Sequence, residues 1–529
     1  MKKISIVFNQ SNNLKEYDYI IIGSGFGGSV SALRLVEKGY KVLVIEKGKW
    51  YKSKDFPKSN WNLKKWLWFP KLKWHGIMKM SFFRHITIIS GVGVGGGSLV
   101  YANTLPIPKK AFYKTGSWKN LADWENELKA HYQTALKMLG ATKNPKLFDG
   151  DLALKKLSKE INREKDFDKT NVAVFFGEPD IKVADPYFNG KGPERVGCNF
   201  CGGCMTGCRN NSKNTLDKNY LFLAQQLGAD ILAENEVYDV VENKQKEGYT
   251  VYLKTSTSFF KKKIQIKAKG VVFSGGVLGT IKLLLKLKKS SLPNISNQLG
   301  MDIRTNNESL ISVTNLDGKK DLSKGVAIGS ILHTDEDSHL EICRYSSGSG
   351  FWKTTHLPYV SGKFPIINVF KIIVSFLKKP LSFLKMYLVK DWAKSTATLL
   401  FMQTLDSKLK FKKNILGVFS SRISEGKKPR TYIPRASELA KKYAKIINGE
   451  ATVFALEPLA GIPSTAHILG GAVMGENINE GVIDKNNLVF GYDNLLIIDG
   501  SMISANPGVN PSLSITAIAE RAMSKIKNK

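Results

Sequence analysis

Long hydrophobic runs are missing from this chain of 529 residues, and no stretch reaches the uninterrupted apolar length that spans a bilayer. Residues 1–13, MKKISIVFNQSNN, contain two lysines, but their apolar run is too short for a secretory signal. Both absences argue against an integral membrane protein and against an exported one. We therefore expect a cytoplasmic protein.

Acidic residues are scarce as well. The chain has 45 Asp and Glu against 79 Lys and Arg, a formal net charge of +34. This charge indicates either a lysine-rich, well-solvated surface or attraction to anionic lipid or nucleic acid. Because no zinc-finger or RNA-recognition signature is present, we expect no nucleic-acid partner and favour lipid. Cysteine is also rare, and four of the five lie within eleven residues, unlike the disulfides of a secreted protein.

The most informative segment that is present runs from Tyr17 to Glu46. Tyr19–Ile22 predicts a buried parallel strand, and Lys41–Ile45 predicts a second strand after a helix. Glu46 stands where a carboxylate would bind a ribose hydroxyl. Between the first strand and the helix lies a G-x-G-x-x-G turn, formed by Gly23, Gly25 and Gly28. Together these features favour dinucleotide binding over a plain βαβ unit with a flexible turn.

A second glycine-rich segment, SGVGVGGGSLVYAN, occupies residues 90–103. Five glycines in seven residues leave backbone N–H groups open to a flat ring or a phosphate, although a mobile loop is the alternative. The cofactor-contact candidates here are Gly93, Gly96, Gly97 and Ser98. A strand at Lys269–Ser274, followed by two glycines and a helix, has the same cofactor-facing geometry.

The C-terminal region offers two further candidates. Leu495–Ile498 predicts a strand and residues 512–526 a helix, for which Asn510 would be a suitable N-cap. The positive N-terminal end of that helix could stabilise a negatively charged reduced ring. His467 precedes a double glycine in PSTAHILGGAVMG. From the residues alone, Asn510 can be a plain cap and His467 a structural histidine.

Five segments, taken in order, resemble the glucose–methanol–choline oxidoreductase family, nearest to its cholesterol oxidase-like bacterial branch. They are IIIGSGFGGSVSALRL, GVGVGGGSLVYAN, SGGVLGTIKLL, STAHILGGAVMG and NPGVNPSLSITAIAERA, and the match covers nearly the whole chain. The resemblance implies non-covalently bound FAD and the oxidation of an alcohol.

The resemblance also implies roles for single residues. Family members use a histidine followed by a His or Asn on the C-terminal helix, which correspond to His467 and Asn510. Steroid-oxidising relatives carry a glutamate in the substrate domain, for which Glu341 in HLEICRY is the nearest equivalent. A neutral imidazole can accept the hydroxyl proton while the hydride goes to flavin N5. Beyond the glycine turns and Glu46, the expected FAD-binding residues are Asn103, Val237, Asp499, Gly500 and Asn510.

We therefore predict an α/β chain, α+β overall, with two domains. A discontinuous Rossmann-like FAD-binding domain would comprise residues 15–110, 210–310 and 461–529. A substrate-binding domain built on an antiparallel sheet would comprise residues 111–209 and 311–460, with a cysteine-rich loop at 198–208.

The cysteine loop allows several interpretations. Cys198, Cys201, Cys204 and Cys208 have the C-x₂-C-x₂-C-x₃-C spacing of bacterial ferredoxins, without the proline that follows there. A structural loop with thiols or disulfides fits as well as a metal site, and among metals an iron–sulfur cluster fits better than zinc. A cluster would favour a dehydrogenase over an oxygen-using oxidase.

Two stretches, Trp61–Phe83 and Phe364–Trp392, interleave aromatic and aliphatic residues with lysine. This pattern suits a protein that lies peripherally on the inner surface of a membrane, and it equally suits buried helices with solvated lysines.

The expected function is oxidation of the hydroxyl of a hydrophobic, sterol- or lipid-like alcohol, with oxygen or another electron acceptor. The alternatives are a dehydrogenase of aliphatic or sugar alcohols that uses a non-oxygen acceptor, and a flavin/iron–sulfur electron-transfer protein. His467 and Asn510 together argue against the electron-transfer protein.

Overall fold

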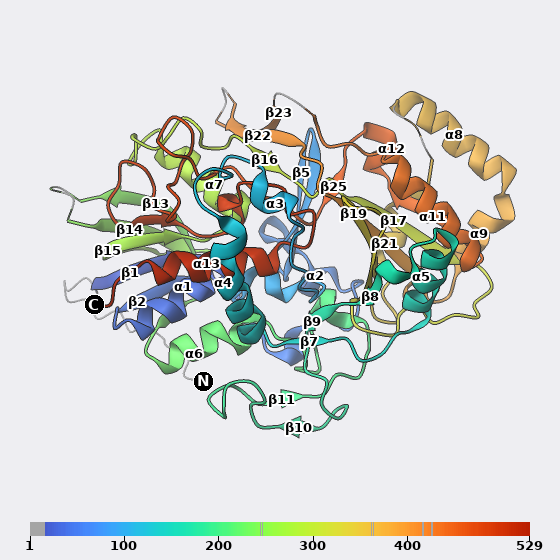
Figure 1. The fold of residues 1–529 in the computed structure, drawn as a ribbon, viewed down its shortest axis with the longest axis horizontal. Helices are drawn as coiled ribbons and strands as arrows, with labels where there is room; N and C mark the ends of the chain where they lie inside the picture. Colours follow the sequence, from blue (N-terminus) through green and yellow to red (C-terminus); the bar gives the residue numbers. More distant parts are fainter. Residues whose placement is uncertain are drawn as a thin grey trace.

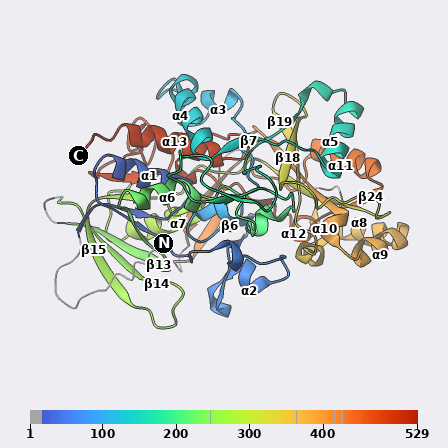
Figure 2. The ribbon, with the colours of Figure 1, turned by 90° about the horizontal axis from the view of Figure 1, so that it is seen from below.

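The computed structural model describes residues 16–243, 245, 247–360, 362, 364–414, 417–424 and 427–529 (Figure 1). The short apolar run within residues 1–13 lies outside this part of the chain. Two seven-stranded sheets stand at opposite ends of the long axis of the molecule (Figures 1 and 2). The structure confirms the mixed α/β class that the sequence predicts.

The first sheet has the order β12-β2-β1-β15-β14-β13, and β26 also pairs with β15. Pairing is parallel among β12, β2, β1, β15 and β26 and antiparallel from β15 to β13. The long β15 serves both parts, because its first half pairs with β14 and its second half with β26. The strands are β1 (Glu16–Ile22), β2 (Val42–Ile45), β12 (Asp230–Leu232), β13 (Asn235–Glu242), β14 (Tyr249–Thr255), β15 (Lys263–Phe273) and β26 (Leu495–Ile497).

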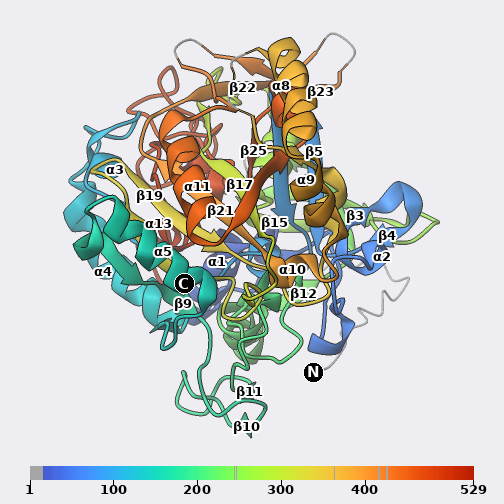
Figure 3. The same cartoon turned by 90° about the vertical axis from the view of Figure 1, so that its right-hand side faces the viewer.

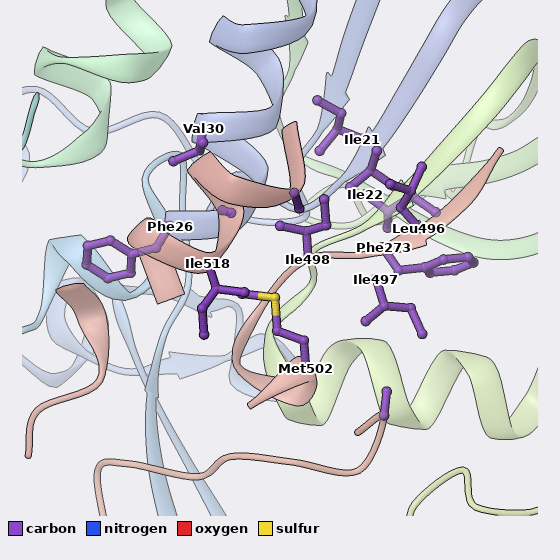
Figure 4. Packing of buried hydrophobic residues seen from close by; sticks show 14 of the residues in the cluster. Ile21, Ile22, Phe26, Val30, Phe273, Leu496, Ile497, Ile498, Met502 and Ile518 are labelled. Carbon is purple, nitrogen blue, oxygen red and sulfur yellow. The ribbon is translucent and has the colours of Figure 1, made fainter. Parts of the chain in front are cut away.

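Helices α1 (Phe26–Glu37), α7 (Gly276–Leu287) and α13 (Ser512–Ser524) enclose the parallel part of this sheet. Six of the seven residues of β1 are buried, as expected for a parallel strand covered on both faces. Figure 4 shows this packing, in which side chains from distant segments meet: Ile21, Ile22, Phe26, Val30, Phe273, Leu496, Ile497, Ile498, Met502 and Ile518. Each fully buried side chain of this size contributes roughly 1.5–3 kcal/mol. The N- and C-terminal segments therefore share one hydrophobic core.

The second sheet has the order β20-β24-β17-β21-β19-β18-β8 and is antiparallel throughout. Helices α5 (Asp149–Glu160) and α11 (Pro434–Ile446) share a hydrophobic core with it. Its strands are β8 (Phe167–Lys169), β17 (Ser309–Asn315), β18 (Ile328–His333), β19 (Ser338–Cys343), β20 (His356–Pro358), β21 (Thr396–Gln403) and β24 (Gly449–Phe454). The domain boundaries given above remain predictions.

The other elements are shorter or lie outside the two sheets. The remaining helices are α2 (Leu63–Trp66), α3 (Ala111–Lys114), α4 (Trp124–Met138), α6 (Tyr220–Gln226), α8 (Pro365–Lys378), α9 (Pro380–Leu388), α10 (Trp392–Ser395) and α12 (Leu456–Ala460). The remaining strands are β3 (Trp68–Phe69), β4 (Trp74–His75), β5 (Met78–Phe83), β6 (Ile86–Gly91), β7 (Ala141–Lys143), β9 (Asn171–Ala173), β10 (Lys182–Val183), β11 (Arg195–Val196), β16 (Ile303–Arg304), β22 (Lys408–Lys413), β23 (Phe419–Ile423) and β25 (Ser464–Thr465). Strand β25 pairs with β6, which brings the segment around His467 beside the second glycine-rich segment.

Candidate active site

A cavity of about 740 Å³ extends from the glycine turns of the first sheet to the strands of the second. This volume is in the range of small-molecule and cofactor sites. On the second sheet its wall includes Leu310, Ile328, Cys343 and Leu400. The sequence-predicted residues that line it are Gly23, Gly25, Glu46, Gly96, Gly97, Val237, His467, Asp499, Gly500 and Asn510.

The first glycine turn joins β1 to α1 with almost no room to spare. Gly23 has φ +106°, and a Cβ there would lie 2.2 Å from the carbonyl oxygen of Ser274. A Cβ on Gly28 would lie 2.1 Å from the carbonyl oxygen of Gly23, so Gly28 packs behind the turn and does not line the cavity. At Gly25, the N-cap of α1, a Cβ would meet nothing within 4 Å. The open space at the start of a helix fits a pyrophosphate.

The second glycine-rich segment packs directly against the first turn. A Cβ on Gly96 would stand 2.7 Å from the Cα of Gly25, and Gly95 N–H donates to Ser24 Oγ at 3.2 Å. Ser98 Oγ donates to the Gly95 carbonyl and accepts from Leu216 N–H, so its hydroxyl is engaged by other protein groups. Gly93, Ser98 and Asn103 are not part of the cavity wall. The loop thus supports the turn through some residues and faces the cavity through Gly96 and Gly97.

The two carboxylates at this end of the cavity are held by local donors. Glu46 accepts from Gly48 N–H at 2.8 Å and from the hydroxyl of Ser24 at 2.8 Å. Asp499 accepts from Thr280 Oγ1 at 2.5 Å and from Ser501, and burial raises the pKa of its carboxyl. Val237 lies on β13, where the pairing with β14 is shifted by an irregularity between Val237 and Asp239. The open space at Gly25 fits the pyrophosphate of FAD. The carboxylate of Glu46 fits a hydroxyl of its ribose.

His467 lies at ion-pair distance from a buried glutamate, although the two facing atoms make no hydrogen bond of standard geometry in the described chain. Its Nδ1 lies 3.1 Å from Oε2 of Glu308, a buried residue just before β17. The Thr465 hydroxyl donates to the other carboxylate oxygen of Glu308 and accepts the backbone N–H of His467. Because Nδ1 faces Glu308, Nε2 is the nitrogen available to a substrate. Glu308 carries no sequence signal, since it lies far from His467 along the chain.

Asn510 lines the same cavity and does not cap the last helix. Helix α13 begins at Ser512 with Pro511 in the N-cap position, and no side chain caps it. The expectation that Asn510 is a plain cap is therefore wrong. Its Oδ1 is buried without a hydrogen-bond partner among the described residues. A buried amide oxygen without a partner is costly, which favours a partner that binds in the cavity.

Glu341 lies in the middle of β19 and is not one of the residues that line the cavity. It is fully buried, and both carboxyl oxygens lack a hydrogen-bond partner within the described part of the chain. Burial raises its pKa to about 8, an effect that the nearby Asn510 amide partly offsets. Cys343, two residues along the strand, and Leu400, opposite on β21, both line the cavity. His339, on the same face of β19, places Nε2 3.8 Å from Glu341 Oε1.

The cavity wall contains a further acid, Glu457 on α12, which no sequence motif marks as a site residue. It is buried, and its pKa is raised to about 8, chiefly by burial and also by the nearby Glu308. Glu457 and His467 thus line the same cavity, and Glu308 lies near both.

The metal site expected at the cysteine loop finds no support. Among the described residues, no group of three or more His, Cys, Asp or Glu side chains is arranged to hold a metal ion. Cys198, Cys201, Cys204 and Cys208 are free thiols; Cys198 and Cys204 are buried and Cys201 is exposed. The loop instead reaches the cavity through Met205.

Comparisons with known proteins find relatives along nearly the whole chain. Models of the N- and C-terminal parts of GMC oxidoreductases match residues 189–304 and 436–519, and a model of an NAD(P)-binding Rossmann-like domain matches residues 21–50. The chain is 46% identical to a cholesterol oxidase of Acinetobacter baumannii, over 98% of this chain and 95% of the relative. It is 40% identical to a cholesterol oxidase of Mycobacterium tuberculosis, over 97% of this chain and 92% of the relative.

Solved structures of lower identity share the fold. Pyridoxine 4-oxidase from Mesorbium loti aligns over 96% of this chain and 98% of its own, with a TM-score of 0.60 and 14% identity. A formate oxidase aligns over 97% and 98%, with a TM-score of 0.61 and 12% identity. The fold, the FAD cradle and the family matches define an FAD-dependent alcohol oxidoreductase. The chain belongs to the GMC oxidoreductase family, and the prediction of that family is confirmed.

Proposed function

We propose that this enzyme oxidises the hydroxyl group of a sterol-like or similarly hydrophobic alcohol, and that it binds FAD non-covalently. The observation that carries this proposal is the position of His467 and Asn510 in the wall of one cavity whose far side, on the second sheet, includes the apolar side chains of Leu310, Ile328 and Leu400. The names of the relatives at 40% and 46% identity support the sterol-like substrate and oxygen as the electron acceptor. The alternative is an electron acceptor other than oxygen. Turnover measured with and without oxygen would distinguish the two.

Bound FAD would supply the acceptor for the hydride that leaves the alcohol carbon. His467 Nε2 accepts the hydroxyl proton, while Glu308 holds the imidazole through Nδ1 and stabilises it once it is protonated. The Asn510 amide binds and orients the hydroxyl. The cavity wall, with Leu310, Ile328 and Leu400, excludes water around an apolar substrate.

Substitution of His467 tests the proton acceptor. We expect His467→Ala to retain FAD and to lose turnover by roughly 10²- to 10⁴-fold, the usual contribution of proton transfer by a side chain. Steady-state turnover and the FAD content of the purified variant would be measured together. Parental turnover in an FAD-loaded His467→Ala variant would contradict the assignment.

We also propose that the enzyme works peripherally on a membrane surface, because a hydrophobic alcohol partitions into lipid. The exposed apolar residues and the positive charge support this proposal. The Trp61–Phe83 stretch, which the sequence also suggests for a membrane surface, gives weaker support. Its Trp66 and Trp68 are buried, whereas Phe69 and Leu72 are exposed.

A further inference from the structure

Helices α8 and α9, with the preceding Phe364, form a unit that we call the α8–α9 hairpin (Phe364–Leu388). Ten of the 26 exposed large hydrophobic side chains in the described chain belong to it. Ile366 is 87% exposed, Leu377 75% and Leu388 71%. Such a contiguous apolar surface is rare on a soluble protein and marks an interaction site.

The exposed residues form one outward stripe on each helix. On α8, Ile366, Phe370, Ile373 and Leu377 recur every three or four residues and are exposed, whereas Ile372 is buried. On α9, Leu381, Leu384 and Leu388 are exposed, whereas Phe383 and Met386 are buried. Both helices therefore turn an apolar face to solvent, at the outer edge of the molecule (Figures 1 and 3). This result excludes the alternative of a buried core helix for this stretch.

The charge of the hairpin identifies what fits this face. From Phe364 to Lys390 the sequence has five lysines and no acidic residue. Such a surface matches an apolar layer bordered by negative charge, as an anionic lipid bilayer presents. A second copy of this chain is disfavoured, since a symmetric contact would set the lysines of both copies against each other. Helix α8 is only about 21 Å long at 1.5 Å per residue, and no helix in the described ranges is long and apolar enough to cross a membrane.

The hairpin is braced on two segments that line the cavity. The Asn368 side chain donates to the carbonyl of Pro458 on α12, next to Glu457. The Tyr387 hydroxyl donates to the carbonyl of His356 at 2.8 Å. Both Glu457 and His356 belong to the cavity wall. The hairpin would thus stand between a bound bilayer and the wall of the cavity.

We propose that the α8–α9 hairpin docks the enzyme on anionic bilayers by lying in the interface, with its apolar stripes in the acyl region and its lysines at the headgroups. The delivery of a hydrophobic alcohol from this bilayer to the cavity rests on the proposed function. The docking itself does not.

Co-sedimentation of the full-length, FAD-loaded enzyme with vesicles tests the docking. Vesicles would contain either phosphatidylcholine alone or an equal mixture with phosphatidylglycerol. We expect binding to the anionic vesicles at low salt, and at least tenfold weaker binding by Ile366→Ser/Phe370→Ser/Leu377→Ser. The matched control is Phe259→Ser/Phe260→Ser, which removes two side chains that are 80% and 83% exposed on the β14–β15 turn. Figure 2 shows β14 and β15 at the opposite end of the molecule.

The lysines give an independent arm of the same test. Lys378→Gln/Lys385→Gln/Lys390→Gln should weaken binding to anionic vesicles by roughly 10²-fold, at about fivefold for each lysine near the surface, and should leave binding to phosphatidylcholine unchanged. Equal binding by parent and hairpin variants, or equal loss in the Phe259/Phe260 control, would overturn the proposal. So would a concentration-dependent dimer of the parent that the hairpin substitutions abolish.

Activity toward an alcohol dispersed in detergent separates the two proposals. The hairpin variants should retain it, because none of the substituted residues lines the cavity. If the parent oxidises a dispersed sterol but ignores anionic vesicles, the docking is wrong and the function stands. If the parent binds the vesicles but oxidises no alcohol, the docking stands and the function is wrong.

Discussion

Single residues decide the chemistry of this site, and Glu308 is the one that the structure adds. His467 could be proposed from its place before a double glycine and from the family resemblance. Its partner could not, because only folding brings β25 and the start of β17 together so that Glu308 and Thr465 meet the imidazole. The same holds for Glu457, whose sequence surroundings do not distinguish it from a surface acid.

Replacing Glu308 with Gln should lower turnover by roughly 10²-fold, because the protonated imidazole loses its carboxylate partner. The readout that separates this role from a merely structural one is the split between kcat, which should fall, and KM, which should stay close to that of the parent. Thr465→Val is the matched control: it removes a hydroxyl from the same carboxylate and leaves the charge. A parental kcat in Glu308→Gln would contradict the positioning role.

The second prediction at this scale concerns Glu457 and stability. Burial raises the pKa of this carboxyl to about 8 in the folded protein, from the ordinary glutamate value of 4.5. Between these pH values the folded state binds more protons, so this contribution to the free energy of unfolding falls as pH rises. Glu457→Gln imitates the protonated form and removes the dependence. The melting temperature of Glu457→Gln should therefore rise relative to that of the parent as the pH increases from 5 to 8.

The exposed Glu438 provides the control, since its pKa is lowered by Arg435 and Glu438→Gln should show no such gain. A melting-temperature difference between parent and Glu457→Gln that is the same at pH 5 and pH 8 would contradict the assignment of a neutral Glu457.

At the scale of elements, the sequence predicts helices and strands best where a segment has a characteristic residue pattern. The βαβ unit has β-branched strands and fixed glycine positions, so β1, α1 and β2 follow from the sequence. The end of the chain shows the limit, because Asn510 has the residue type of a cap and yet Pro511 takes that position. Contact between the two glycine segments is also invisible in the sequence, since it depends on tertiary packing.

That contact gives a prediction for Gly96→Ala. Gly96 has φ +53°, and an added Cβ would press on Gly25 at 2.7 Å. We expect the first turn to shift and the dissociation constant for FAD to rise at least tenfold, measured by flavin fluorescence on titration of the apoprotein. Gly190→Ala is the matched control, because Gly190 also has a positive φ (+80°) but meets nothing within 4 Å. Equal FAD affinity in both variants would show that the contact does not shape the cradle.

For the whole molecule, the cavity is a product of assembly. Its walls come from the first glycine turn, the strands of the second sheet and the segments around His467 and Asn510. The first glycine turn is hundreds of residues away from the other segments along the chain. The class of fold and the family could be predicted from ordered motifs. The shape of the cavity wall could not, because residues 310–460 carry no recognisable motif. The positive charge and the lysines among apolar residues were visible in the sequence, but only the fold shows that the apolar stripes of this hairpin face solvent.

The central claim is that His467 and Asn510 serve oxidation of a hydrophobic alcohol in this cavity. The most direct test is anaerobic stopped-flow spectroscopy of the FAD-loaded enzyme mixed with a detergent-dispersed sterol, with glucose as the comparison. We predict rapid bleaching of the flavin by the sterol, slowed by at least 10²-fold in His467→Ala, and no bleaching by glucose. Bleaching by glucose and not by the sterol, or equal bleaching rates in parent and variant, would contradict the account.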